Sequence, residues 1–208
     1  DNSGLLKGMV LTFRDITQQR EATLEIKRQA DRAEALLQAA SQLSGQRDLE
    51  KVLLAICEIT NRTLKAAGTA VFLRDATKNM FRDRTMVSDD EKLKAYSGNR
   101  FEIPSEVFRT ILSHQDPVVL ISDIKKYPDL PYLELFAKLE IKAIAIAALF
   151  QEESLSGALI SVFKENDRHP VGDEIALLKG LADQALSSIE NAELFEQVRA
   201  GRERQKKL

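Results

Sequence analysis

The sequence predicts an α+β fold in which one antiparallel sheet of about six strands carries helices on both faces and lies between two long helices. Three observations lead to this prediction. Residues 18–44 and 172–208 lack proline and repeat apolar residues every three or four positions, as helices do. Short strand-like and helix-like segments alternate between them. Near the end of this middle region, two segments are apolar at nearly every position, which is typical of strands covered on both faces.

The composition describes a globular chain and argues against several partner classes. Hydrophobic residues make up 44% of the 208 positions, so the chain has the means to form a core. A net charge of −2 argues against a nucleic-acid-binding surface. The longest apolar run, residues 143–150, is far shorter than the roughly 20 residues that span a bilayer. The lone cysteine, Cys57, excludes an internal disulfide and fits a reducing compartment, so we expect a cytoplasmic location.

Two stripes of small and apolar residues, spaced alternately three and four positions apart, predict two helices that pair along narrow seams. The first stripe lies in residues 18–45, which we interpret as a linker or coiled-coil helix, and comprises Ile26, Ala30, Ala33, Leu37 and Ala40. The second lies in residues 172–208, an exit signalling helix, and comprises Leu178, Leu181, Ala185, Ser188, Ala192 and Phe195. We expect both stripes to pair with their copies in a parallel homodimer.

The elements between these helices follow from caps, turns and apolar periodicity. Asp48 suits the N-cap of a helix that extends to about Gly68. Ser88 with Glu91 predicts a capping box at the start of a short helix. The other elements are expected in this order: strands 68–74 and 80–86, strand 100–103, helix 104–113, strand 117–122, helix 131–139, and strands 141–150 and 155–163.

Four strings, most of them within residues 46–171, resemble a GAF domain. DLEKVLLAICEITNRTL is similar to the first helix of that family, and VGDEIALLKGLADQALSSIENAELFEQV is similar to its exit helix. FEIPSEVFRTILSHQDPVVLISDI resembles the third strand, central helix and fourth strand, and IKAIAIAALFQEESLSGALISVF resembles the two core strands. The resemblance implies a GAF-like six-stranded sheet and a regulatory role.

The first 17 residues carry a second resemblance. LLKGMVLTFRDITQQRE is similar to the last strand and exit motif of a PAS sensor domain, with Asp15 and Thr17 at the motif's Asp and Thr positions. The resemblance implies that residues 1–17 end an upstream PAS domain. Because the sequence has no initiator methionine and stops within a helical pattern, we expect it to be a fragment of a longer protein.

Nothing in the sequence predicts catalysis, a metal or a cofactor. Cys57 lies between apolar residues of a helix, which indicates a buried structural thiol. His114 and His169 have no second ligand at metal spacing, which also argues against haem. Bilin-binding GAF domains attach the pigment to a cysteine in the second half of the domain, and this chain has none there. We therefore expect this segment not to be an enzyme.

The resemblance also implies a small-molecule pocket between the sheet and the short helices. Two departures from the family pattern bear on it: Ser105 begins the triplet that stands where glycines commonly open the central helix, and Ala148 replaces a proline. The same residues also suit a packed core, and both alternatives remain open. The residues expected to line the pocket are Phe101, Val107, Phe108, Ile111, Ile121, Asp123, Tyr127, Tyr132, Phe136 and Ile144.

The function expected from these features is signal relay in a bacterial multidomain sensor of the histidine-kinase type. An upstream PAS domain would act on the linker helix, and the exit helix would pass a change in helix arrangement to a downstream output domain. Two alternatives stay open: a module that senses a small molecule, and the regulatory part of a diguanylate cyclase or a transcription regulator.

Overall fold

The computed structural model describes residues 17–43, 46, 48–75, 77–112, 115–165 and 170–205. Its centre is a six-stranded sheet with the order β3-β2-β1-β6-β5-β4, and every neighbouring pair is antiparallel. The fold class predicted from the sequence is therefore confirmed. The strands are β1 (Gly68–Asp75), β2 (Met80–Ser88), β3 (Glu102–Pro104), β4 (Val118–Ile121), β5 (Ala143–Gln151) and β6 (Ser154–Phe163).

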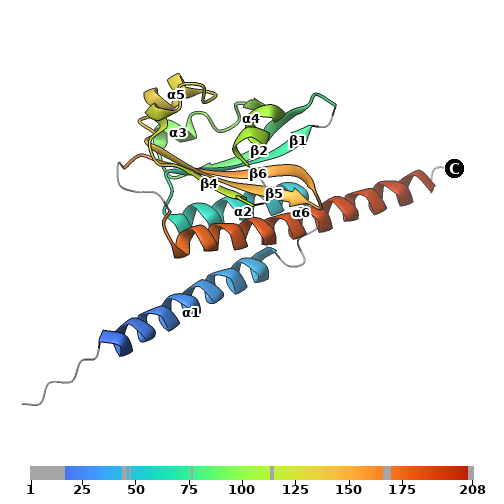
Figure 1. Cartoon of the computed structure of the whole chain (residues 1–208). Coiled ribbons are helices and arrows are strands. Elements are labelled where there is room, and N and C mark those ends of the chain that lie inside the picture. The colour runs from blue at the N-terminus through green and yellow to red at the C-terminus, as the bar shows by residue number, and fades with distance from the viewer. Residues whose placement is uncertain are drawn as a thin grey trace, which may run out of the picture.

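Helices cover both faces of this sheet (Figure 1). Two long helices, α2 and α6, lie against one face, and the short helices α3, α4 and α5 lie over the other. The helices are α1 (Thr17–Leu43), α2 (Leu49–Leu64), α3 (Glu91–Lys94), α4 (Ser105–Ile111), α5 (Leu133–Lys138) and α6 (Asp173–Gln205), and residues Ile124–Lys126 form a 3₁₀ turn.

Strand β5 shows why the middle of the chain is apolar at nearly every position. Ala143, Ala145 and Ala147 belong to the core shared with α2 and α6, and their small side chains let these helices approach the sheet. Ile144 and Ile146 belong to the core under the short helices. Successive side chains of a strand point to opposite faces, so a strand that is covered on both sides needs apolar residues at every position.

Helix α1 runs parallel to α6 and packs on its first half. Arg28 Nε lies 3.8 Å from Asp173 Oδ2 near the start of α6, and Leu36 packs at Gly180, about two turns further along both helices. A Cβ atom at Gly180 would lie 2.9 Å from Cδ2 of Leu36, so the glycine is what lets α1 come this close. The start of α1 and the end of α6 extend beyond the folded body in opposite directions (Figure 1).

The prediction that the stripe on α6 forms a dimer seam is wrong for most of its residues, because they are buried within the chain. Leu178, Leu181 and Ala185 lie in the core that α6 shares with α2 and β5, as does Ala192, and Ser188 is buried with them. These five residues are used within the chain, so they are unavailable to a second copy. Phe195, the last member of the predicted stripe, is 48% exposed.

The stripe predicted on α1 lies beside the packing face of that helix, roughly 100° around the helix axis from it. Ile26 is 68% exposed and Leu37 is 71% exposed, and the alanines at positions 30 and 33 are exposed as well. The face of α1 that contacts the body is formed instead by Leu36, Ala39 and Leu43. The α1 stripe, here the four residues Ile26, Ala30, Ala33 and Leu37, therefore faces outward.

Several predictions concern residues that the structure does not describe. The PAS-like strand, Asp15, His114 and His169 lie outside the described residues. Within the described part of the chain, none of the helices is both long and apolar enough to span a bilayer.

Candidate ligand cavity

An apolar cavity of about 90 Å³ lies on the face of the sheet that the short helices cover. Strands β1 and β6 form its floor, and α3, α5 and the segment before β3 form its walls. It is lined by Gly68, Thr69, Ala70, Phe72, Met86, Leu93, Tyr96, Phe101, Ile103, Tyr132, Leu135, Phe136, Leu139, Ile160 and Val162.

Strand alternation and aromatic packing position this lining. Ala70 and Phe72 of β1 are two residues apart and so share one face of the sheet, as do Ile160 and Val162 of β6. The Phe72 ring makes an edge contact with Phe108, with ring centroids 6.2 Å apart. On the opposite side, the rings of Phe101 and Tyr132 meet edge to face at 5.2 Å. These contacts fix the walls without filling the space between them.

Two of the three hydroxyl groups among the described lining residues are engaged in hydrogen bonds, and the third belongs to Tyr96. The Tyr132 hydroxyl donates to the Glu102 carbonyl at 2.7 Å and accepts from the Glu102 N–H at 2.9 Å. The Thr69 hydroxyl turns to the other face of the sheet, where it bonds to Asn61 of α2 and to Ser161. No charged side chain is among the described residues that line the cavity. The cavity therefore offers mainly van der Waals contact, with the Tyr96 hydroxyl as the remaining polar group of its described lining.

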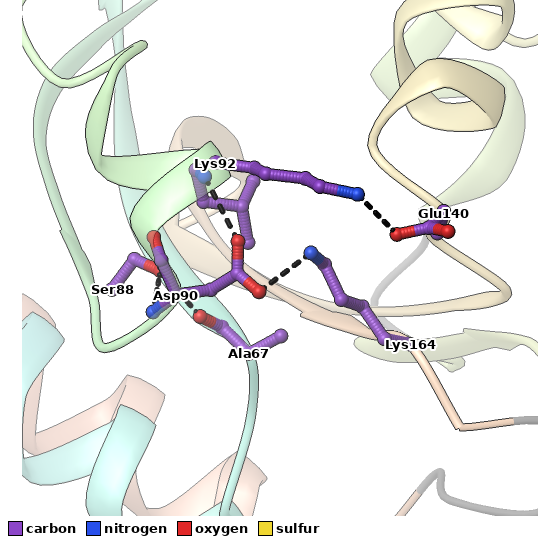
Figure 2. A network of polar contacts seen from close by, with 7 residues as sticks. Ala67, Ser88, Asp90, Lys92, Glu140 and Lys164 are labelled. Carbon is purple, nitrogen blue, oxygen red and sulfur yellow. Dashed lines mark hydrogen bonds and ion pairs between the residues drawn. The ribbon is translucent and has the colours of Figure 1, made fainter.

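A polar network ties the rim of the cavity together (Figure 2). Asp90 caps α3 by accepting from the Leu93 N–H at 3.0 Å, and its other oxygen receives the Lys164 ammonium at 2.6 Å. Lys92 reaches across to Glu140 at 2.7 Å. Leu93 and Leu139 line the cavity next to these charges. The network thus connects α3 to the turn after α5 and to the end of β6.

Asp90 is the charged group at the centre of this network. The hydrogen bond from Lys164, followed by the one from the Leu93 N–H, lowers the pKa of the Asp90 carboxyl. The predicted capping box is wrong in its assignment of the N-cap: Asp90 holds that position, and Ser88 ends β2. The Ser88 hydroxyl accepts from the Asp90 N–H and donates to the Ala67 carbonyl, so it fixes the turn before α3.

The structure distributes the ten predicted pocket residues over three environments. Phe101, Tyr132 and Phe136 line the cavity. Asp123 caps the 3₁₀ turn by accepting from the Lys125 N–H, and Tyr127 is 46% exposed; neither lines the cavity. The remaining five belong to the surrounding core or pack against it: Val107, Phe108, Ile111, Ile121 and Ile144.

Sequence reasoning missed most of the cavity floor. Ala70 and Val162 stand in strands that were predicted, and their positions alternate with residues of the opposite core. Assigning each strand position to one face would have placed Ala70, Phe72, Ile160 and Val162 together. The cavity itself has no such signal, because it depends on how far α3 and α5 stand from the sheet.

The Cys57 thiol lies in the core on the other face of the sheet, away from the cavity. Burial raises the pKa of the Cys57 thiol to about 12, which keeps it protonated at neutral pH. The prediction of a buried thiol is confirmed. Among the described residues, no cluster of three or more histidine, cysteine or acidic side chains could hold a metal ion.

Comparison with solved structures identifies the same arrangement of strands and helices in several bacterial proteins. The GAF domain of a phosphoenolpyruvate-protein phosphotransferase from Coxiella burnetii is 15% identical, with a TM-score of 0.64 over 78% of this chain and 95% of that one. The chromophore-binding domain of a bacteriophytochrome from R. palustris is 16% identical, with a TM-score of 0.63 over 77% of this chain and 61% of that one.

A third similar structure is an enzyme, the free methionine-R-sulfoxide reductase from Neisseria meningitidis in complex with its substrate. It is 13% identical, with a TM-score of 0.63 over 90% of this chain and 98% of that one. At these identities the likeness concerns the fold alone. A search of curated proteins finds no match. The GAF domain family model, however, matches residues 48–189, which is most of the chain, and the protein therefore belongs to the GAF domain family.

Proposed function

We propose that this chain is a relay module of a multidomain bacterial sensor, of the histidine-kinase type, which works as a parallel homodimer paired along the α1 stripe. GAF domains are in general regulatory or sensory modules. The observation that carries the proposal is the outward-facing stripe of four apolar residues on α1. A second observation supports it: α1 and α6 are parallel and in contact, so a movement of one helix can reach the other.

The exposure of the α1 stripe favours a partner. Ile26 and Leu37 each leave more than two thirds of their surface in solvent, although they lie on a helix with a repeat typical of coiled coils. Burying such a side chain stabilises a complex by about 1.5–3 kcal/mol before the costs of association. A second copy offers the matching stripe automatically, because a two-fold symmetric interface uses the same residues on both sides.

A parallel dimer also suits the directions in which α1 and α6 extend beyond the folded body. It places both incoming helices at one end of the dimer and both outgoing α6 helices at the other. The exposed Leu194, Phe195 and Val198 on the outgoing part of α6 then continue the contact beyond the body. A signal acts by shifting the balance between two helix arrangements, and couplings of this kind are typically about 1–3 kcal/mol.

The parts of the relay outside this segment are proposals of the same kind. Residues 1–17 belong to an upstream PAS domain, and the output domain that follows α6 is a histidine kinase. A diguanylate cyclase or a transcription regulator is the alternative output domain, because the paired α6 helices of the dimer can regulate either one in the same way. The module itself is regulatory, is cytoplasmic, and neither carries out catalysis nor binds nucleic acid or a cofactor.

A second candidate function is the sensing of a small molecule. The apolar cavity between the sheet and the short helices favours it. The ion pair between Asp90 and Lys164 supports a route from the cavity to α6, because Lys164 directly follows β6 on the way to that helix. In this reading, the relay carries a signal that arises in the GAF domain as well as one that arrives from α1.

Sedimentation velocity tests the dimer on which the relay depends. The double variant Ile26→Asp with Leu37→Asp places charges in the stripe and should raise the dimer Kd by at least about tenfold. The matched control, Leu24→Asp with Gln38→Asp, adds the same charges to another exposed side of α1 and should leave the Kd unchanged. A monomeric wild-type chain, or equal weakening by both variants, would contradict the proposal.

A further inference from the structure

We propose that the cavity binds a small, uncharged, apolar molecule about the size of a single aromatic ring. This inference rests on the second candidate function, in which the chain senses a small molecule. It goes further by naming the chemical class of that molecule. The class follows from three properties of the cavity: its lining, its volume and its rim.

The lining selects against charge. A charged ligand would leave water for a space whose described walls are aliphatic and aromatic, with no basic or acidic partner among them. The hydroxyl of Tyr132 is engaged twice by the Glu102 backbone. The hydroxyl of Thr69 is turned away toward Asn61. Burying a charge without such partners is strongly unfavourable, so nucleotides, amino acids and carboxylates do not fit this site.

The volume selects for a small molecule. The cavity holds about 90 Å³ of free space between side chains. An engineered apolar cavity of about 150 Å³ in another protein stays dry and binds benzene. The cavity here is smaller but is not fully enclosed, so a single ring is the upper limit for its guest. The rings of Phe72, Phe101 and Phe136 surround the space and suit the edge-to-face contacts that aromatic guests prefer. Water gains few hydrogen bonds here, so an apolar guest displaces it readily.

The rim allows a ligand to enter. Helix α5 has only six residues and none of them is fully buried, although Leu135 and Phe136 pack against the core under the short helices. The pair between Lys92 and Glu140 bridges α3 to the turn after α5, and both side chains are more than 60% exposed. Exposed pairs of this kind contribute little to stability, so opening this bridge between α3 and the turn after α5 costs little.

Toluene and benzoate test this assignment, because they share a ring and differ in charge. Thermal unfolding of the intact chain should shift upward by about 3–6 °C with toluene at roughly ten times its Kd. Benzoate at the same concentration should leave the melting temperature unchanged. Equal shifts with both compounds, or no shift with toluene up to its solubility limit, would overturn the assignment.

Variants locate the binding site. Ala70→Leu fills the cavity from β1 and should abolish the toluene shift, whereas Ala55→Leu enlarges an alanine of α2 in the other core and should retain it. Leu135→Ala widens the cavity and should shift the preference from toluene to naphthalene. If Ala70→Leu melts without cooperativity, the change in preference with Leu135→Ala decides the matter alone. The proposed binding site would be contradicted if a folded Ala70→Leu chain still showed the thermal shift with toluene. It would also be contradicted if Leu135→Ala still preferred toluene to naphthalene.

The same samples separate this inference from the proposed relay. If toluene does not bind but the chain dimerises through the α1 stripe, the ligand class is wrong and the relay stands. If toluene binds and the chain remains a monomer, the ligand class stands and the dimeric relay is wrong. Sedimentation with and without toluene therefore distinguishes the two failures.

Discussion

The two long terminal helices have the same heptad spacing and opposite surroundings. On α6, the residues at this spacing are packed inside the chain, with Leu181 only 4% exposed. On α1, the residues at this spacing lie in solvent, with Leu37 at 71% exposed. Spacing alone therefore identifies a helix with an apolar side, and it does not say which surface that side will meet.

The width of the apolar side explains the difference. On α6, Ala182 and Ile189 flank the stripe and are buried with it, so the apolar face is broad enough to cover a sheet and a neighbouring helix. On α1, the residues next to Ile26 and Ala30 are charged or polar, so the stripe stays narrow. A narrow stripe suits one partner helix, and a broad face suits a domain core.

The largest expected effect comes from placing the same charge in the two stripes. Leu181→Asp buries a carboxylate without a partner and should lower the free energy of unfolding by about 4 kcal/mol or more. Leu37→Asp lies in solvent within one chain and should change the stability of the monomer by no more than about 0.5 kcal/mol. Urea unfolding at low protein concentration, where dimers dissociate, measures both. Comparable losses would remove the distinction between the helices.

Thiol reactivity should separate the two surfaces almost as strongly. Cys57 lies in the core that α6 covers, and its pKa is raised to about 12 from 9.0, mainly by burial. At pH 8 the fraction of thiolate is then about 1,000-fold below that of an ordinary cysteine. In dilute protein, where the proposed dimer dissociates, a cysteine introduced by Leu37→Cys should react with Ellman's reagent at the ordinary rate, and Cys57 should react only on unfolding. Fast labelling of Cys57 would show that the α6 core opens readily.

A smaller effect is expected at Gly180, where the two helices meet. Gly180→Leu cannot fit beside Leu36 and should lower the free energy of unfolding by about 1–3 kcal/mol, with increased hydrogen exchange in α1. Gly180→Ala should be nearly neutral. Its gain in helix propensity, about 1 kcal/mol, offsets a small shift of the flexible Leu36 side chain. Unchanged exchange in the leucine variant would mean that α1 does not depend on this contact.

The smallest expected effect concerns Asp90, whose partner Lys164 precedes α6. Asp90→Ala removes the cap of α3 and should cost about 1 kcal/mol, whereas Asp90→Asn keeps a capping oxygen and should cost less. Because the folded pKa of Asp90 is lowered, its contribution is present above the ordinary carboxyl pKa and is lost as the pH falls through the folded value. The difference between wild type and Asp90→Asn should therefore shrink below about pH 4. A difference that stays constant down to pH 2 would argue against the ion pair.

Elements with a strong local signal were predictable from the sequence. The caps and periodicity of α2, and the unbroken apolar strands β5 and β6, led directly to the sheet and its two covers. The N-cap of α3 was misassigned because Ser88 and Asp90 are both good capping residues, and only the strand register decides between them. The burial of the α6 stripe depended on Ala182 and Ile189, which widen it by one position in each heptad.

The candidate site was less accessible to prediction for a physical reason. Of the residues predicted for a pocket, Phe101, Tyr132 and Phe136 line the cavity, whereas Phe108, Ile121 and Ile144 belong to the core around it. Apolar residues that fill a core and apolar residues that leave a space have the same chemistry. Only the distance between the short helices and the sheet separates them, and no local pattern encodes it.

Distances between spin labels on the two copies of α1 test the central proposal most directly. Single cysteines at Leu24 and Gln38 lie on solvent-exposed positions of α1 that are equivalent in the heptad, and the buried Cys57 does not interfere. A parallel dimer predicts distances of similar size at both sites. An antiparallel pair would instead change the distance by about 3 Å for each residue moved along the helix. Distances of that pattern, or none within range, would contradict a parallel pairing of α1.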